Sequence, residues 1–443
     1  MFGTGLGQFI PIVAYLGFWI MAIVSLGGKP LYGLYYMIPF IPYRTMRDHF
    51  LPFPLGENML TILVLSVIVG AIIHGKRLPK SKLYIIWLVF GIYLYLSLWL
   101  GTAISNAPAP LSSADVNFLT WKGYMLIPLI FAAAGLVIED RKAVRTVVLL
   151  TAIAVFFIDR SSLTDSMSHS WAIFDEDKRG GGPLGFGSNQ TAAYLAQFAV
   201  FFWGFVQFAT RGKVKLAGYL LAAATIFTAM YCFSRAGYLA ILFGVLVLGI
   251  LKDRKLLLVL GVFLLVWQSV VPTAVRERVN MTQDSNGQLE ASAQERVDLW
   301  QNAERSIERS PIVGNGFATF QLGEHVDNLK DTHNWYVKVL EETGIIGLIF
   351  ALLLLQQMMA VSYRLFKRAT DPLYRGLGLG LILAICACIV ANFFGDRWTY
   401  IEITAPLWVL VSAAIRAKDL TESESILIST EDASVDAEAP YYA

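Results

Sequence analysis

Residues 373–394 have the sequence LYRGLGLGLILAICACIVANFF, with a single charged side chain, Arg375. A helix needs about 20 mostly apolar residues to cross the hydrocarbon core of a bilayer, and this run is long enough. Comparable runs occur near 8–27, 58–74, 84–102, 118–138, 143–159, 188–209, 214–233, 235–251, 255–272, 336–360 and 400–416. The sequence therefore predicts an all-α polytopic membrane protein with about twelve transmembrane helices.

The stretch 30–43 is apolar but short, and it contains Pro39 and Pro42. Proline interrupts helices because it lacks a backbone N–H. This stretch is expected to be either a broken or re-entrant piece or a thirteenth crossing. The path of residues 28–57 stays open from sequence alone, as does the question whether Arg44, Arg47 and His49 face the periplasm.

The composition of the 443 residues agrees with a lipid environment, with 56% hydrophobic and only 15% charged residues and a mean hydropathy of +0.57. An ordinary soluble domain has about 25% charged residues. The net charge of +2 is too balanced for a nucleic-acid-binding protein. All three cysteines lie in apolar runs without the spacing of a zinc or redox motif, so no thiol chemistry is expected.

Lys and Arg gather in every second connection from residue 58 onward, and cytoplasmic loops collect these residues. The basic connections contain Lys76, Arg77, Lys80 and Lys82; Arg141, Lys142 and Arg145; Arg211, Lys213 and Lys215; Lys252, Arg254 and Lys255; and Arg364, Lys367, Arg368 and Arg375. The alternate connections, at 103–117, 160–187, Ser234, 273–335 and 395–399, are then expected on the opposite, periplasmic side.

Four segments follow from this path. Residues 1–272 are expected to form an N-terminal transmembrane bundle that includes a periplasmic loop at 160–187. A large, partly helical periplasmic loop domain at 273–335 comes next, followed by C-terminal transmembrane helices at 336–418. Residues 419–443 carry acidic side chains without Lys or Arg and are expected to be a disordered cytoplasmic tail.

The loop at 273–335 has a sequence that predicts a helix. Ser292-Ala-Gln-Glu295 fits a capping box, and Ser310-Pro311 ends the run. The apolar face of this amphipathic helix can lie on the membrane domain or in the membrane interface, and Arg296 and Trp300 share one face of it. His333-Asn334 then lies where the chain re-enters the membrane. A histidine there is either an exposed loop residue or a group for proton transfer near neutral pH.

Two other stretches can bind an anion. Ser234-Arg235-Ala-Gly lies between two apolar runs, so Arg235 either extends to lipid headgroups or holds a pyrophosphate with paired hydrogen bonds. The glycines between Arg179 and Asn189 allow backbone amides to approach an anion or a sugar, or they form a flexible linker. The acidic residues and His325 near His333 lack the spacing of a metal site, so no metal is expected.

In their order along the chain, these residues resemble the O-antigen ligase family. This is a group of polytopic bacterial glycan-transfer proteins that also includes O-antigen polymerases and protein O-oligosaccharyltransferases. The resembling features are Arg179 with its glycines and Asn189, Ser234-Arg235-Ala-Gly, Arg296-x-x-x-Trp300, Pro311-Ile-Val-Gly-Asn-Gly-Phe317, His333-Asn334 and Glu342-Thr-Gly-Ile-Ile-Gly347.

The resemblance implies a glycosyltransferase of the bacterial inner membrane. It would transfer a glycan from undecaprenyl pyrophosphate to an acceptor hydroxyl at the periplasmic face, without a cofactor or metal. An O-antigen ligase, which uses lipid A core as acceptor in lipopolysaccharide or surface polysaccharide biosynthesis, is favoured. His333 would be the catalytic base, and Arg235 and Arg296 would bind the pyrophosphate. The other implied substrate-binding residues are Arg179, Asn189, Trp300 and Asn334.

Several alternatives stay open. A polymerase would use another lipid-linked repeat as acceptor, and a protein O-oligosaccharyltransferase would use a protein hydroxyl, with the same donor machinery. A polysaccharide transporter or flippase would explain the number of helices but not the residues of the loops. A structural subunit of an envelope polysaccharide assembly would need none of the residues above.

Overall fold

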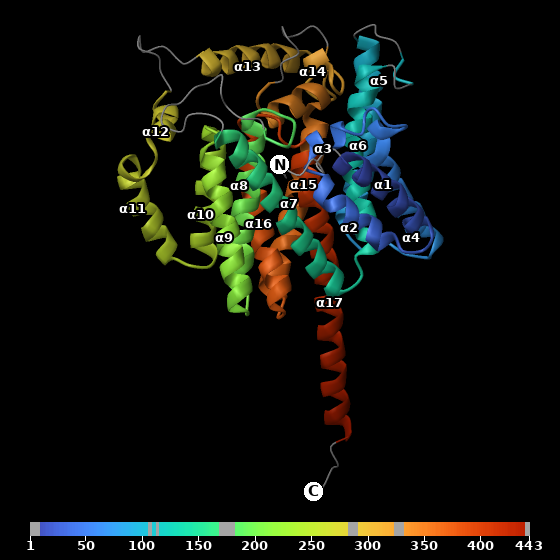
Figure 1. Ribbon diagram of the computed structural model, residues 1–443. Helices are drawn as coiled ribbons and strands as arrows, with labels where there is room; N and C mark the ends of the chain where they lie inside the picture. Colours follow the sequence, from blue (N-terminus) through green and yellow to red (C-terminus); the bar gives the residue numbers. More distant parts are fainter. Residues whose placement is uncertain are drawn as a thin grey trace.

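The computed structural model describes residues 9–104, 109–111, 115–167, 182–281, 291–322 and 332–438. Within these residues the regular structure is helical throughout, without a β-strand (Figure 1). The expected all-α class is therefore confirmed for the described part of the chain.

Twelve helices fall on the predicted apolar segments. They are α1 (Ile10–Leu26), α4 (Met59–Ile73), α5 (Lys82–Ile104), α6 (Val116–Val137), α7 (Arg141–Met167), α8 (Ser188–Phe205), α9 (Gly212–Met230), α10 (Arg235–Leu251), α11 (Lys255–Val270), α15 (Trp335–Arg368), α16 (Pro372–Asn392) and α17 (Ile401–Glu438). The other elements are α2 (Pro30–Phe40), α3 (Arg44–Asp48), η2 (Gly56–Asn58), η4 (Val206–Phe208), α12 (Thr273–Asn280), α13 (Ala291–Arg309) and α14 (Thr319–Leu322).

In the described part of the chain, fewer helices than the expected twelve are long and apolar enough to span a membrane. Among the described residues, eight helices are long and apolar enough to cross a membrane, and the pair α11 and α12, bent by 106°, makes a ninth if taken as one span. The apolar helices α1 and α10 have only 17 residues each. The apolar part of α17 also carries Glu402, Arg416 and Lys418. The protein is thus a multi-pass membrane protein with fewer full-length spans than its apolar runs indicate.

The stretch whose path the sequence left open is a broken piece. Helix α2 has 11 residues, begins at Pro30 and contains Pro39, so it is too short to cross a bilayer by itself. It packs against α1, α4 and α7. The chain then turns through α3, which carries Arg44 and Arg47, before η2 leads into α4.

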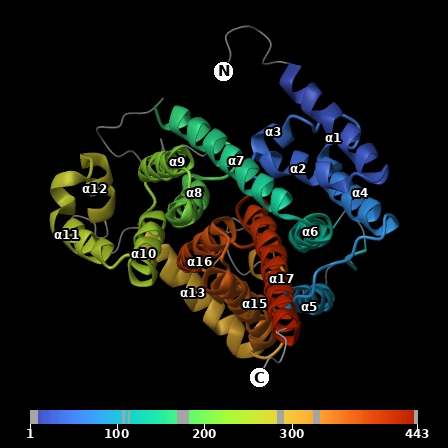
Figure 2. The same ribbon diagram turned by 90° about the horizontal axis from the view of Figure 1, so that it is seen from below.

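Helix α16 lies at the centre of the bundle, in contact with α8, α10, α15 and α17 (Figure 2). Its glycines allow close packing on α8, because a Cβ at Gly380 would lie 2.7 Å from the carbonyl oxygen of Phe201. Such small residues at helix contacts are typical of membrane bundles. This close packing makes α16 part of the core of the bundle.

The two ends of the bundle differ. Helix α13 lies across one end, which we call the α13 end, while the α6–α7, α8–α9 and α15–α16 connections lie at the other, which we call the basic end (Figure 1). The amphipathic helix predicted from the capping box is α13. Its residues Leu299 and Ala303 pack with Phe320 and Val337, so the apolar face lies on the helical domain.

Helix α17 continues from the bundle at the basic end as far as Glu438 (Figure 1). The sequence predicts a disordered tail from residue 419, so the helix and this expectation differ over 419–438. No Gly or Pro interrupts the chain between Pro406 and Pro440, and without such residues a helix has no strong stop signal.

Candidate functional site

His333 lies in the short segment before α15 and has a φ of 49°. Few residues other than glycine adopt this left-handed conformation, and strained backbone of this kind occurs at functional sites. The neighbouring residues hold it in place. The buried Thr332 donates its hydroxyl to the carbonyl oxygen of Asn334 at 2.7 Å, and its Oγ1 accepts from the Asn334 N–H at 3.3 Å. The turn is thus fixed on both sides of the histidine.

Two further residues of the expected site hold this turn from outside. Trp300 on α13 donates its Nε1–H to the carbonyl oxygen of Thr332 at 2.8 Å. The Asn334 side-chain oxygen accepts from the N–H groups of Tyr336 and Val337, at 3.0 and 3.3 Å, and so caps α15. Both residues were expected to bind substrate, and their contacts here are those of positioning residues. The Trp300 side chain is still 39% exposed, which leaves its ring accessible to a ligand.

Arg235 is the first residue of α10, and its Nη1 donates to the carbonyl oxygen of Met281 at 3.1 Å. The turn before it packs against α12 through a cluster of Tyr231, Phe233, Ala274 and Val275. Arg278, on α12, is buried in the same corner, and its Nε–H donates to the carbonyl oxygen of Phe233 at 3.4 Å. The sequence reasoning missed Arg278, whose only signal was the short basic run Arg276-Glu-Arg278.

The remaining expected residues are spread over other elements. Arg296 lies partly buried on α13, one turn before Trp300. Asn189 lies half-buried in the first turn of α8. Arg179 lies outside the described residues, so its part in the site stays a prediction.

A cavity of about 700 Å³ opens between α1, the α3–η2 region, α4, α6, α14, α15 and the connection from α16 to α17. Aromatic rings line it, from Phe18, Phe50, Tyr124, Phe186, Phe317 and Tyr400. Charged residues of both signs also line it: Arg44, Arg47 and Lys338 with Asp48, Glu57, Glu342, Asp396 and Glu402. None of the site residues expected from sequence, in the described part of the chain, forms part of this wall.

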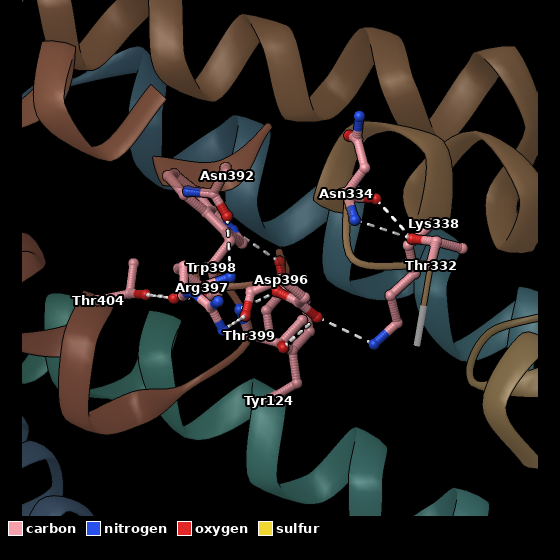
Figure 3. Close-up of polar contacts among 10 residues, drawn as sticks. All are labelled: Tyr124, Thr332, Asn334, Lys338, Asn392, Asp396, Arg397, Trp398, Thr399 and Thr404. Carbon is pink, nitrogen blue, oxygen red and sulfur yellow. Dashed lines mark hydrogen bonds and ion pairs between the residues drawn. The ribbon is translucent and has the colours of Figure 1, made fainter. Parts of the chain in front are cut away.

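An ion pair inside the cavity links it to the His333 turn. Lys338 lies one turn after Asn334 on α15, and its Nζ donates to Asp396 at 2.9 Å (Figure 3). Asp396 is 1% exposed and also accepts from the Thr399 N–H at 3.1 Å. On another wall, Arg47 of α3 pairs with Glu402 of α17. The cavity is therefore held by ion pairs between segments far apart in the sequence.

Two buried glutamates follow Lys338 on α15. Glu341 accepts from the Ser306 hydroxyl at 2.6 Å and from the Asn315 amide at 3.2 Å, which ties α13 to α15. Glu342 is 3% exposed and lines the cavity, and its Oε1 has no hydrogen-bond partner among the described residues. A buried polar atom without a partner is costly, and this oxygen is closed off from solvent by the surrounding residues.

The buried ion pair leads to a prediction of stability. Lys338→Met leaves the buried Asp396 without its cation, which should lower the free energy of unfolding by about 3–5 kcal/mol. Lys76→Met is the matched control, because Lys76 and its partner Glu139 have side chains that are 34% and 49% exposed. Its loss should cost at most about 1 kcal/mol. Thermal unfolding of the purified variants in detergent measures both, and an equal loss of stability would contradict the assignment.

The comparisons with known proteins agree with the resemblance drawn from the sequence. Residues 218–352 match a family model described as O-antigen ligase. This range runs from α9 into α15 and includes Arg235, Arg296, Trp300, His333 and Asn334. No curated protein matches the chain. The segment that is similar to the O-antigen ligase family therefore contains the turn that holds His333.

Proposed function

From the O-antigen ligase family segment at 218–352, we propose that this protein transfers a glycan from undecaprenyl pyrophosphate to an acceptor hydroxyl. Within the family we propose the ligase role, with lipid A core as the acceptor. The observation that carries the proposal is the His333 turn. Inside the matched segment, Trp300 on α13 donates a hydrogen bond to Thr332, and Asn334 accepts one from Tyr336 at the start of α15. His333, between Thr332 and Asn334, is thereby held in a strained conformation.

We further propose that the α13 end faces the periplasm of a bacterial inner membrane and that the C-terminus is cytoplasmic. The support is the distribution of charge: the connections that collect Lys and Arg lie at the end of the bundle opposite α13 (Figure 1). Cytoplasmic loops of membrane proteins are enriched in these residues.

In the proposed reaction, His333 takes the proton from the acceptor hydroxyl as the oxygen attacks the anomeric carbon of the donor sugar. The bond between that carbon and the pyrophosphate oxygen breaks, and the pyrophosphate leaves as an anion on its lipid. Arg235 and Arg296 stabilise the charge that develops on it, since guanidinium groups bind phosphate oxygens in pairs. Direct displacement inverts the anomeric centre.

The cavity suits the sugar part of a substrate better than the pyrophosphate. Its two inner cations, Arg47 and Lys338, are already paired with carboxylates, and three basic residues face five acidic ones along its wall. A doubly charged pyrophosphate would therefore gain little electrostatic stabilisation in this cavity. Aromatic rings instead offer apolar surface to a sugar ring, and the exposed carboxylates of Asp48 and Glu57 offer hydrogen-bond acceptors to sugar hydroxyls.

The experiment that tests the function compares the glycans left on undecaprenyl pyrophosphate in a deletion strain that carries either wild type or His333→Ala. For a ligase, long chains should accumulate on the carrier with His333→Ala, because polymerisation is intact and only attachment fails. Accumulation of single repeats would make the protein a polymerase.

Two other outcomes would reject glycan transfer altogether. If the carrier-linked glycan of the His333→Ala strain stays inaccessible from the periplasm, the protein acts in transport. If His333→Ala restores normal surface glycan while the deletion does not, the protein has a structural role only.

A further inference from the structure

A second cavity lies at the basic end of the bundle, away from the site described above. It has a volume of about 560 Å³ and lies between α7, the end of α8 with η4, α9 and the start of α16. Most of its wall is apolar, formed by Val148, Leu149, Ala152, Phe202, Phe205, Val206, Phe208, Val214, Ala217, Leu221 and Leu373. We call it the basic-end groove.

Three arginines line the same groove: Arg141 and Arg145 on α7 and Arg211 before α9. Arg141 forms an ion pair with Asp371, and its Nη2 lies 3.2 Å from Oδ1 of that residue. The side chains of Arg145 and Arg211 are exposed and have neither a hydrogen bond nor an ion pair to another described residue. One of the three cations is therefore neutralised within the protein and two are available to a ligand.

We propose that the basic-end groove binds an anionic phospholipid, with its phosphate on Arg145 and Arg211 and an acyl chain along the apolar wall. The two arginines match the phosphate of this ligand, and the apolar part of the wall matches its acyl chain. A small soluble anion would leave the apolar surface uncovered, and a lipid without net charge would leave two guanidinium groups without a partner.

The position in the bundle agrees with this ligand. Basic pockets between transmembrane helices on the cytoplasmic side bind acidic lipid headgroups, and we place the basic end on that side. Two elements of the wall also pack directly on each other. A Cβ at Gly218 would lie 2.1 Å from Cγ1 of Val206, so α9 and η4 meet there. The groove thus combines two exposed arginines with a packed apolar wall, and its proposed role does not depend on glycan transfer.

The test is native mass spectrometry of the full-length protein in detergent, titrated with phosphatidylglycerol or with phosphatidylcholine of the same acyl chains. Wild type should bind phosphatidylglycerol more tightly than phosphatidylcholine. The double variant Arg145→Ala/Arg211→Ala should lose about 30-fold in affinity for phosphatidylglycerol, since each basic residue near an acidic lipid contributes roughly a factor of five. Inorganic phosphate should not compete.

A matched control removes the same amount of charge from the first turn of α9, next to Arg211. Lys213→Ala/Lys215→Ala takes away two cations of the α8–α9 region that do not line the groove, and it should change the affinity by less than about threefold. Ala217→Trp fills the apolar wall without a change of charge and should also weaken binding. The melting temperature of each variant shows that it is folded.

The proposal is overturned if the arginine and lysine variants lose equal affinity, because the attraction would then be non-specific. It is also overturned if phosphatidylcholine binds as tightly as phosphatidylglycerol, or if inorganic phosphate competes. In that last case the groove would hold a free anion and not a lipid.

Discussion

Replacement of His333 by alanine should lower the rate of glycan transfer by about 10²- to 10⁴-fold, the usual contribution of a general base. The measurement uses purified protein with a lipid-linked glycan donor and a hydroxyl acceptor. The loss should appear in kcat, because the imidazole is proposed to act on the reacting hydroxyl and not to hold the donor. A variant with more than about a tenth of the wild-type rate would refute the role of His333 as base.

Asn334 provides the control that separates positioning from substrate binding. Its side-chain oxygen caps α15, and an aspartate caps a helix as well as an asparagine does, whereas an alanine does not. Asn334→Asp should therefore keep most of the activity and Asn334→Ala should lose it. If the amide nitrogen of Asn334 bound the substrate, both variants would fail alike.

Replacement of Arg235 or Arg296 by alanine should each remove most of the transfer activity, because both guanidinium groups are proposed to stabilise the leaving pyrophosphate. Lysine should restore only part of it, since an ammonium group cannot form the paired hydrogen bonds of a guanidinium. Steady-state rates with varied donor concentration measure the effect. Normal activity in the double variant Arg235→Lys/Arg296→Lys would disprove the pyrophosphate site.

Arg141→Lys is the matched control for this prediction. Arg141 is also an arginine of the same bundle, but it pairs with Asp371 at the basic end, and its lysine variant should keep the donor affinity of wild type. Activity should also survive EDTA. A loss that a divalent cation restores would show that a metal, and not the arginines alone, stabilises the pyrophosphate.

The sequence predicted well what depends on local patterns. The apolar runs located the helices, and the capping box with Ser310-Pro311 located α13, because helix signals lie within a few residues of one another. The number of complete spans among the described residues was overestimated, because α1, α10 and α11 have only 16 or 17 residues each and the apolar part of α17 carries charged side chains. Hydropathy alone does not measure where a helix begins and ends.

The cavity could not be predicted, because its ion pairs join distant parts of the chain. Arg47 and Glu402 are 355 positions apart, and Lys338 and Asp396 are 58 apart. In the sequence these four residues stand near the ends of apolar runs. For the two cations, Arg47 and Lys338, contact with the lipid headgroups is an equally good interpretation there. The same limit applies to Trp300 and Asn334, whose bonds to the His333 turn are visible only in three dimensions.

The attachment of α13 has a mechanical consequence. Trp300 donates a hydrogen bond to Thr332, the residue before His333, and Ser306 donates one to Glu341, two turns after it. A single helix, α13, therefore contacts the chain on both sides of the histidine. If α13 lifts to admit a bulky acceptor or to release the product, the imidazole loses its alignment at the same moment. Any movement of α13 and the alignment of the proposed base would then be coupled, and transfer would require α13 in the position seen in the structure.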